Sequence, residues 1–571
     1  MIPSMIYLIV LITSSVTAET PDTSSNSVKI FHTNNMNSQF EPTMYENRSI
    51  GGLGRIARYI RTRKDKEWIL LIDSGDFFGG SDWFKLTKGK ISGEMWNDGL
   101  DDILRIKTFG EKELEYGMEY FLNYFRSEYY AWTVCANCKS EGIAKDFFSP
   151  FKYLRELGIT GIVCQRKDFI QNILNFTNPI PALLAVVDEM RKTNKIRIVI
   201  VISHCGYEMD KKLATDMRGV DIVVGGHSGE FLYTNPPSEV IVDQQPAGPY
   251  PTEIMGPNKR LIRIVTASNN AKYLGSFLFT HTSIVEKWNG NPILMSDEIE
   301  EDRKVKAILD KYEPVVEGIK QSIVGISYVI LQGYDDNCKI RECNLGNLIT
   351  DAITFKFANM TSFKGRWSLS GISIINGGAI ATGITPSSRA RTVRYGDLLK
   401  ALPFYNSIYI VRVSGKELRE ALEHSVSDEF IPGSSVARSQ FLQVSGIRVI
   451  YNLDEPQGMR IVAVKVRCGE CMKIIYKDIN PKEFYNIGMT DYLMKGGDGY
   501  KMFRADNVLG DWIKNGKLDL VDTVKEFMQR QKLVEPVTQE RIVLLTPRRC
   551  SGELLKFKSV LYSLVVCIIV L

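Results

Sequence analysis

The feature that most constrains the fold is a series of short apolar runs, each of strand length and each ending in polar or glycine residues. The runs are Val28–Phe31, Trp68–Ile72, Ile159–Cys164, Ile196–Ser203 and Val220–Val224. Helical stretches alternate with them between residue 28 and about residue 280. Strands of this kind are buried on both faces, and ligands bind at their carboxyl ends. The pattern therefore predicts an α/β domain with its site where the runs end.

Side chains that can do chemistry follow several of these runs. They are His32 after the first run, Asp73 and Asp76 after the second, and His204 and His227 after the last two. Taken singly, such residues are more often structural than functional. Their repeated position at strand ends is what makes them candidates.

A second domain is expected from the length of the chain. The 571 residues, 44% of them hydrophobic, are too many for one ordinary core and too apolar for disorder. Residues 296–322 are rich in charge and carry apolar residues at helical spacing, namely Val305, Ile308, Leu309 and Tyr312. This stretch predicts an amphipathic linker helix between two domains. The second domain, 323–547, mixes strands and helices around the glycine-rich segments "NGGAIATG" and "KGGDGY".

The charge of the chain argues against a nucleic acid partner. Its 71 basic and 66 acidic residues give a net charge of only +5, and no concentrated basic run occurs.

Both ends of the chain indicate the secretory route. Met1–Ala18 contains an apolar run and small residues before Glu19, which is typical of a signal peptide. This segment lacks Lys and Arg, so a buried first strand is the alternative.

At the other end, Ser559–Leu571 is apolar, but as a helix it would rise only about 20 Å against a hydrocarbon core of about 30 Å. With the small residues 550–552 before it, the segment 548–571 fits a lipid (GPI) attachment signal. A tail-anchored or simply secreted form stays open.

An extracellular route allows the cysteines to pair. Cys338 and Cys343 lie close together in polar, turn-like sequence, as do Cys468 and Cys471, and both pairs predict short-loop disulfides. Cys135 and Cys138 are a third candidate pair, and a metal knuckle is the alternative for a CxxC motif. Cys164 and Cys205 end or follow apolar runs and are interpreted as buried thiols.

The order of these segments resembles the 5′-nucleotidase/apyrase family, the ecto-5′-nucleotidases in particular. The resemblance runs from residue 28 to about 545. The matching stretches include "FHTNNMNSQFEP", "GGLGRIARYI", "LIDSGDFFGGS", "ISHCGYEMD", "DIVVGGHSGEFLY", "RECNLGNLITDAI", "INGGAIATGI", "ALPFYNSIYIVRVSGKELREALEHSV", "FLQVSGIRVIYNL" and "YLMKGGDGYKMF". It implies an α/β (α+β) protein of two domains. These are an N-terminal calcineurin-like metallophosphatase sandwich (19–295), a linker helix (296–322) and a C-terminal nucleotide-binding domain (323–547).

The family uses two divalent metals, usually zinc, about 4 Å apart, to polarise the attacking water and the phosphoryl oxygens. The resemblance places the bridging carboxylate on Asp76 and the histidines of one metal on His204 and His227. The family's Asp and His ligands of the other metal fall on Asn35 and Asn37, and an amide oxygen is a weak, neutral ligand.

The third metal-site segment also departs from the family pattern. It reads "GEKELE" at 110–115, where Glu111 replaces an Asn ligand. Lys112 replaces the family's catalytic His, and Glu115 replaces the Asp that partners it. Asp76, Glu111, His204 and His227 therefore remain as donors for one zinc or another divalent ion.

The resemblance also implies a nucleoside site. The two rings that stack on the base fall on Phe404 and Tyr492, and the carboxylate on the ribose hydroxyls falls on Asp498, with Asn376 also present. Of the phosphate-binding arginines, one is replaced by Ala381 and another by Lys339, with Arg341 nearby. Loss of a bidentate guanidinium weakens a phosphate contact.

The sequence thus predicts a secreted or GPI-anchored relative of the 5′-nucleotidases with a degenerate dimetal site, which binds purine nucleotides or nucleosides and hydrolyses them weakly or not at all. Two alternatives remain. One is a one-metal phosphohydrolase acting on AMP, ADP or ATP with help from Lys112, and the other is a non-catalytic cell-surface interaction protein. Association of two copies of the chain into a homodimer is a further possibility.

Overall fold

The computed structural model describes most of the chain between residues 26 and 545. The described residues are 26–65, 68–114, 122–123, 131–139, 148–164, 175–193, 195–240, 243–281, 286–334, 337–360, 368, 370–427, 438–469, 471, 473–504, 507–509 and 518–545. The predicted signal peptide, the predicted attachment signal and Glu115 lie outside them. The chain divides into two compact units, the first ending at Ile319 and the second starting at Lys320.

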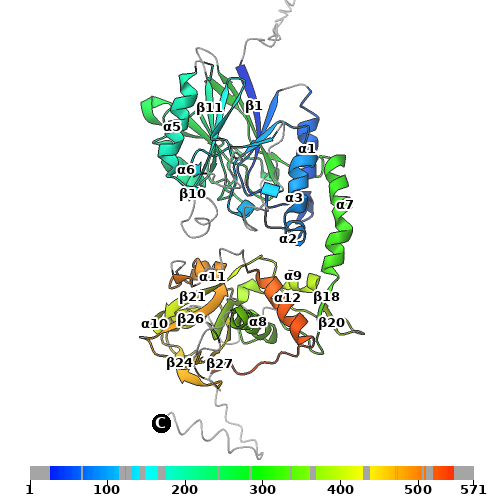
Figure 1. Ribbon diagram of the computed structural model, residues 1–571, viewed down its shortest axis with the longest axis vertical. Helices are drawn as coiled ribbons and strands as arrows, with labels where there is room; N and C mark the ends of the chain where they lie inside the picture. Colours follow the sequence, from blue (N-terminus) through cyan, green and yellow to red (C-terminus); the bar gives the residue numbers. More distant parts are fainter. Residues whose placement is uncertain are drawn as a thin grey trace, which may run out of the picture. The chain divides into compact units, whose positions relative to one another are not determined.

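The first unit contains two large sheets (Figure 1). Within its described residues, one sheet has the order β16-β15-β1-β4-β5-β6, with β17 also paired to β15. These strands are β1 (Asn26–Thr33), β4 (Ile69–Asp73), β5 (Arg105–Lys107), β6 (Ala131–Thr133), β15 (Tyr273–His281), β16 (Glu286–Asn289) and β17 (Ile293–Leu294). Strands β1, β4, β5 and β6 are mutually parallel.

The other sheet of the first unit has the order β13-β14-β12-β11-β9-β8. Its strands are β8 (Phe151–Leu154), β9 (Leu157–Val163), β11 (Ile198–His204), β12 (Ile222–Gly225), β13 (Thr252–Met255) and β14 (Leu261–Val265). Strands β9, β11, β12 and β14 are parallel neighbours. All five apolar runs identified in the sequence therefore form strands of these two sheets.

Two apolar cores explain why these strands are buried on both faces. Ile30 and Ile72 pack in one core with Ile200 and Val223 of the other sheet. Phe31 and Leu71 are adjacent to these residues in the same strands, so their side chains point to the opposite face of the sheet, where they pack in a second core. The arrangement is a sandwich of two sheets, as the resemblance implied.

Helices complete the first unit. They are α1 (Leu53–Arg61), α2 (Asp82–Thr87), α3 (Lys90–Glu94), α5 (Pro179–Lys192), α6 (Tyr207–Ala214) and α7 (Arg303–Lys320). Helix α7 begins after Asp302, whose Oδ1 accepts hydrogen bonds from the backbone N–H groups of Lys304 and Val305. The four residues expected to form its apolar face are buried in the second core of the first unit. Among its described residues, the unit also has two small two-stranded sheets. They are formed by β2 (Thr43–Tyr45) with β3 (Arg48–Ile50) and by β7 (Cys138–Lys139) with β10 (Asn175–Phe176).

The second unit is built around two further sheets with the orders β21-β26-β19-β22 and β25-β24-β23-β27, and β18 pairs with β20. Its strands are β18 (Ile323–Ile326), β19 (Ile372–Asn376), β20 (Thr392–Arg394), β21 (Ile408–Ser414), β22 (Leu442–Ser445), β23 (Ile447–Asn452), β24 (Ile461–Arg467), β25 (Tyr476–Asp478), β26 (Phe484–Thr490) and β27 (Ile542–Leu545). Its helices are α8 (Asn344–Met360), α9 (Tyr395–Ala401), α10 (Gly415–Ser425), α11 (Asp491–Met494) and α12 (Leu520–Gln531).

Disulfide bonds join four pairs of cysteines among the described residues. Two of them, Cys338–Cys343 and Cys468–Cys471, are the predicted short loops, and Cys135–Cys138 is the third candidate pair. The interpretation of Cys164 and Cys205 as thiols is wrong, because these two form a disulfide. The parallel register of β9 and β11 pairs Val163 with His204, so the next residues of the two strands meet.

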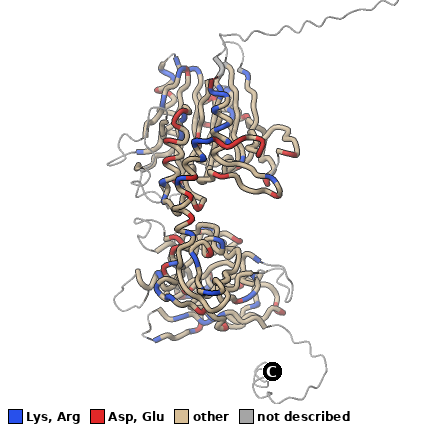
Figure 2. Tube along the Cα trace, turned by 90° about the vertical axis from the view of Figure 1, so that its right-hand side faces the viewer, with Lys and Arg blue, Asp and Glu red and all other residues tan. Residues whose placement is uncertain are grey.

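The described residues show no helix long and apolar enough to cross a membrane. Basic and acidic residues are interspersed along the backbone trace of each unit (Figure 2). This distribution agrees with the low net charge of the sequence.

Candidate functional site

In the first unit, a cluster of possible metal ligands lies where several strands end. Strands β11 and β12 are parallel neighbours. His204 is the last residue of β11 and His227 lies in the loop after β12, so both come to the same edge. Glu111, in the loop after β5, joins them, and one ligand atom of each of the three residues lies within 4.8 Å of the others. Asp76, in the loop after β4, approaches the cluster with its Oδ1 3.6 Å from His204 Nε2. The structure therefore brings all four predicted donors together.

The orientation of His204 suits a metal ligand. The ring is buried, and its Nδ1 lies 2.7 Å from the carbonyl oxygen of Ser74, to which Nδ1–H can donate. Its Nε2 is buried and has no hydrogen-bond partner among the described residues. Burial alone would lower the pKa of His204, but the Asp76 carboxylate and the Ser74 carbonyl raise it above its ordinary value. The surroundings of Nε2 thus favour a bound positive charge.

The loop that carries Asp76 is fixed by Glu113, a residue that no sequence motif indicates. The buried carboxylate of Glu113 accepts hydrogen bonds from the backbone N–H groups of Asp76, Phe77 and Gly110 at 2.7 to 3.0 Å. Gly110 also has to be glycine, since a Cβ there would lie 2.2 Å from Asp76 Oδ1. Glu113 is visible in the sequence only as one acidic residue of "GEKELE". Nothing in the neighbouring sequence indicates that its carboxylate bonds to the loop that carries Asp76.

Asn35 and Asn37 lie beside this cluster and are both hydrogen-bonded. Asn35 Nδ2 donates to the carbonyl oxygen of His227 at 2.8 Å, and the N–H of His227 donates to Asn35 Oδ1 at 2.9 Å. Asn37 Nδ2 donates to Asn270 Oδ1 at 2.6 Å, and the ammonium of Lys112 donates to Asn37 Oδ1. The two amides thus act as hydrogen-bonding groups between loops.

The donors present fit a divalent ion. Two imidazoles and one or two carboxylates are ligands that zinc accepts, and a buried, unpartnered Nε2 is what such an ion would use. The ion would supply Lewis-acid charge toward a phosphoryl oxygen.

In the second unit, Asp498 is the centre of a polar network. Asn376 Nδ2 donates to its Oδ2 at 2.7 Å, and the hydroxyls of Tyr492 and Ser439 donate to its Oδ1 at 2.8 and 3.0 Å. His424 contacts the Asp498 carbonyl oxygen through Nε2 at 2.7 Å. Asn376 Oδ1 is buried and has no partner among the described residues, so it can accept a bond from a ligand.

The two predicted stacking residues are exposed aromatics, Phe404 in the loop after α9 and Tyr492 in the short helix α11. Phe404 is 59% exposed and Tyr492 is 42% exposed, which is unusual for rings that only fill a core. The start of α11 is joined to the segment after Phe404, because Asp491 N–H donates to the Ser407 carbonyl at 2.8 Å and Ser407 N–H donates to the Asp491 carboxylate at 3.1 Å. Gly497 lies against the Tyr492 ring, where a Cβ would approach to 2.5 Å.

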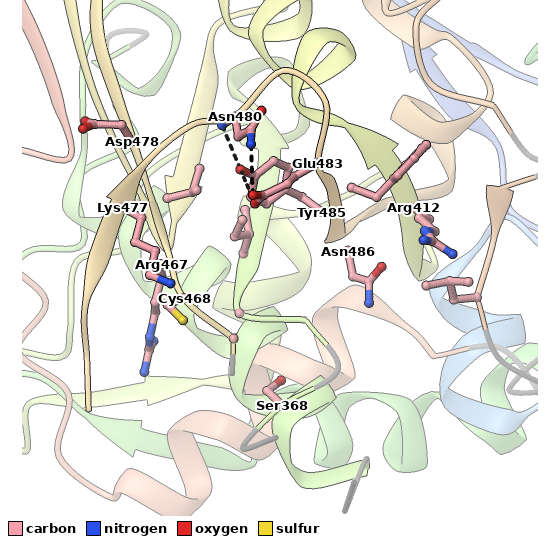
Figure 3. A pocket seen from close by; sticks show the side chains of 16 residues that line it. Ser368, Arg412, Arg467, Cys468, Lys477, Asp478, Asn480, Glu483, Tyr485 and Asn486 are labelled. Carbon is pink, nitrogen blue, oxygen red and sulfur yellow. Dashed lines mark hydrogen bonds between the residues drawn. The ribbon is translucent and has the colours of Figure 1, made fainter. Parts of the chain in front are cut away.

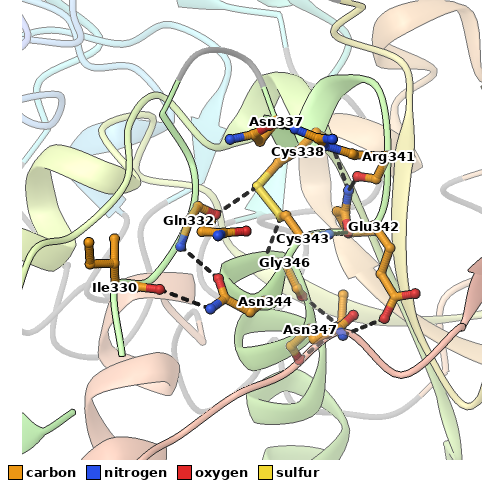
Figure 4. The surroundings of a disulfide bond; sticks show 12 residues. Ile330, Gln332, Asn337, Cys338, Arg341, Glu342, Cys343, Asn344, Gly346 and Asn347 are labelled. Carbon is orange, nitrogen blue, oxygen red and sulfur yellow. Dashed lines mark hydrogen bonds between the residues drawn. A yellow bond between two sulfur atoms is a disulfide. The ribbon is translucent and has the colours of Figure 1, made fainter. Parts of the chain in front are cut away.

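Lys339 is the last residue of the short helix Asn337–Lys339. Arg341 follows it, beside the Cys338–Cys343 disulfide (Figure 4). The guanidinium of Arg341 donates to Asn337 Oδ1. Gln443 fixes the same loop, with Nε2 donating to the carbonyl oxygens of Cys338 and Arg341 at 2.8 and 2.7 Å. The loop packs on the "NGG" segment, since a Cβ on Gly377 would lie 2.4 Å from the Cys338 carbonyl oxygen.

A separate cavity of about 850 Å³ also lies in the second unit. Figure 3 shows Arg412 and Asn486 on one side of it and Arg467 and Lys477 on the other. Because Ser414 pairs with Phe484 and Ile408 pairs with Thr490, the cavity lies at the opposite end of β21 and β26 from the two exposed aromatics. None of the predicted catalytic, substrate-binding or metal-ligating residues lines it, although Cys468 of a predicted disulfide does.

A two-sheet sandwich with histidine and carboxylate donors at its strand ends, joined to a second α/β unit, defines a two-domain metallophosphoesterase. Residues 322–505 match the model of the 5′-nucleotidase C-terminal domain. The chain is 32% identical to a 5′-nucleotidase of Homo sapiens and 31% identical to one of Bos taurus, and each match covers 95% of this chain and 94% of the relative.

Among solved structures, the chain is similar to a 5′-nucleotidase precursor from Thermus thermophilus. The TM-score is 0.58 at 26% identity, and the match covers 91% of this chain and all of that one. The chain belongs to the 5′-nucleotidase family, whose function is nucleotide hydrolysis.

Proposed function

We propose that this member of the family binds purine nucleotides or nucleosides outside the cell, that its first unit holds one divalent ion, and that its hydrolytic activity is weak or lost. The observation that carries the proposal is the double hydrogen bond between Asn35 and the backbone of His227. Both amide atoms of Asn35 are used in these bonds, so the side chain joins two loops.

The donor set supports one ion rather than two. Glu111, His204 and His227 converge on one point, with Asp76 adjoining. On the side of Asn35 and Asn37, the cluster meets neutral amides and an ammonium. Loss of one metal from a two-metal site removes several kcal/mol of transition-state stabilisation, which corresponds to orders of magnitude in rate.

The second unit supports nucleoside binding. Exposed rings at Phe404 and Tyr492 offer stacking surfaces, which are worth about 1 to 3 kcal/mol per base in single-strand binders. Asp498 offers carboxylate oxygens to sugar hydroxyls, and Asn376 offers an unpartnered acceptor. Lys339 and Arg341 are the proposed phosphate contacts of this unit.

An extracellular location is also proposed. Four disulfides suit an oxidising compartment, and Asn47 in the sequence Asn-Arg-Ser is exposed, as a glycosylation acceptor would be. The assignment of 1–18 as a signal peptide and of 548–571 as a GPI-attachment signal belongs to the same proposal, as do the domains 19–295 and 323–547 with a linker at 296–322. A homodimer stays a prediction.

One observation favours a second candidate, a slow one-metal phosphohydrolase that releases phosphate from AMP, ADP or ATP. Lys112 places a cation beside the donor cluster through its contact with Asn37. Such a cation can stabilise charge on a phosphoryl group, although an ammonium is less directional than a metal. Glu115, the predicted partner of this residue, lies outside the described residues.

The test combines binding and turnover on the purified protein. Calorimetric titration with adenosine and with AMP should give binding, and metal analysis after dialysis should give one zinc per chain. Phosphate release from AMP should not exceed that of an Asp76→Ala variant. Two metals per chain would contradict the proposal, whereas one metal with release well above that of the variant would favour the phosphohydrolase.

A further inference from the structure

We propose that Lys112 is a fixed cation that binds the phosphoryl group of the ligand, and that its ammonium, rather than a second divalent ion, supplies the positive charge on the amide side of the donor cluster. The inference deepens the proposed function and rests on it. It assigns the phosphate contact of the first unit to one side chain.

The position of the ammonium is determined by two loops. Lys112 Nζ donates to Asn37 Oδ1, and the orientation of that carboxamide is set by its Nδ2, which donates to Asn270 Oδ1 at 2.6 Å. The side chain of Asn37 can therefore present only its oxygen to the lysine. Reversal of the amide would place Nδ2 against the ammonium and lose both bonds.

The stem of Lys112 is also fixed. It lies on the bare backbone of Gly79, where a Cβ would come within 2.5 Å of Lys112 Cδ. The next residue, Gly80, lies against Asn37 in the same way, with a Cβ position 2.7 Å from Asn37 Cβ. Both glycines adopt positive φ, 87° and 74°, which is costly for other residues. A lysine stem is normally flexible, so the position of its charge varies. This packing restricts the rotamers of Lys112 and so restricts the position of its ammonium.

The same residue is joined to the donor cluster. The backbone N–H of Lys112 donates to Asp76 Oδ1 at 3.1 Å, and the preceding residue, Glu111, is a member of the cluster. An ammonium has three N–H donors, of which Asn37 uses one. The other two can serve an anionic oxygen that also contacts an ion held by the cluster.

A second divalent ion on this side would meet unfavourable neighbours. Both amide atoms of Asn35 are bonded to the backbone of His227. Both amide atoms of Asn37 are bonded too, one of them to a positive charge. Two positive charges a few ångströms apart repel strongly wherever water is partly excluded. The arrangement is consistent with a phosphate held by one ion and one ammonium.

The experiment is a calorimetric titration of inorganic phosphate into the zinc-loaded, full-length protein. In Lys112→Met, which keeps the stem and removes the charge, we expect phosphate to bind at least about tenfold more weakly. One zinc per chain and an unchanged adenosine affinity should remain. Lys112→Arg keeps a cation and should recover part of the phosphate affinity. Lys90→Met, which removes an exposed lysine of the same unit, is the matched control and should behave as wild type.

The outcomes separate this inference from the proposed function. Equal phosphate affinity in wild type and Lys112→Met, no phosphate binding by zinc-loaded wild type, or two zinc ions per wild-type chain would each overturn the inference. In the first two cases, adenosine binding with one zinc per chain would leave the proposed function intact. Wild type that binds neither zinc nor adenosine would overturn the proposed function as well. Retained zinc in Lys112→Met shows that this variant is folded.

Discussion

The carboxamide of Asn35 bonds to both backbone groups of His227, donating to the carbonyl oxygen and accepting from the N–H. Only an amide side chain of this length can do both, because a carboxylate has no donor at neutral pH. His227 adopts a φ of 76°, which is uncommon for a residue other than glycine, and the two bonds stabilise that turn. The position thus has a structural task in this chain that an aspartate could not perform.

Asn35→Asp should therefore destabilise the protein. The carboxylate would face the His227 carbonyl oxygen without a proton between them, at a cost of about 1 to 3 kcal/mol. The measurement is urea unfolding at pH 7 in the presence of a chelator, so that metal binding does not mask the effect. Asn35→Asp with unchanged stability and a second bound metal would contradict the assigned role of the amide.

Removal of His204 should abolish metal binding. His204→Ala deletes the buried Nε2 that has no hydrogen-bond partner among the described residues and leaves two of the three converging donors, so the ion should be lost on dialysis. The measurement is zinc content by elemental analysis after dialysis against metal-free buffer. His424→Ala, which removes a histidine of the second unit, should keep its zinc. Equal zinc in both variants would place the metal elsewhere.

Phe404→Ala should weaken nucleoside binding by about 1 to 3 kcal/mol, since one stacking surface is lost. The side chain is 59% exposed, so the melting temperature should change little. Titration calorimetry with adenosine measures the affinity, and Phe484→Ala, which removes another exposed ring of the same unit, is the control. If the two variants bind adenosine equally well, Phe404 is not a base platform.

Asp210 should make the stability of the first unit depend on pH. Burial raises the pKa of its carboxyl to about 7, with the Ser203 hydroxyl and His204 opposing this and Glu230 adding to it. The folded protein then holds a proton that the unfolded chain releases near pH 4, so stability declines as the pH rises from about 4 to about 7.

Asp210→Asn removes this titration. Relative to the variant, wild type should lose as much as about 4 kcal/mol between pH 4 and pH 8, given about three units of difference in pKa. Chemical unfolding of both proteins at a series of pH values, with a chelator present, measures the difference. Parallel curves would show that Asp210 is ionised in the folded protein at neutral pH.

Much of the fold could be predicted from the sequence because its signal is local. The apolar runs form strands, and Val305, Ile308, Leu309 and Tyr312 form the buried face of a helix. The Cys164–Cys205 disulfide was missed because its partners are 41 residues apart and meet only through the parallel register of two strands.

The sequence was enough to predict which residues form the site, but not the hydrogen bonds that hold them. The resemblance to the family placed the donors, and the positions of Asp76, His204 and His227 at the ends of predicted strands agreed with it, since ligands bind at the carboxyl ends of parallel strands. The hydrogen bonds that explain Asn35 and Asn37 could not be predicted, because their partners His227, Asn270 and Lys112 come from loops far along the chain. The role of Glu113 is hidden for the same reason.

Whether the protein binds nucleotides without efficient turnover can be decided by one paired measurement. Purified protein in excess zinc is given AMP, ADP and ATP, phosphate release is compared with that of Asp76→Ala, and AMP binding is measured by calorimetry on the same sample. We expect AMP binding by the wild-type protein and phosphate release no greater than that of the variant. Release far above the Asp76→Ala level would contradict this expectation and show that the remaining metal site sustains catalysis.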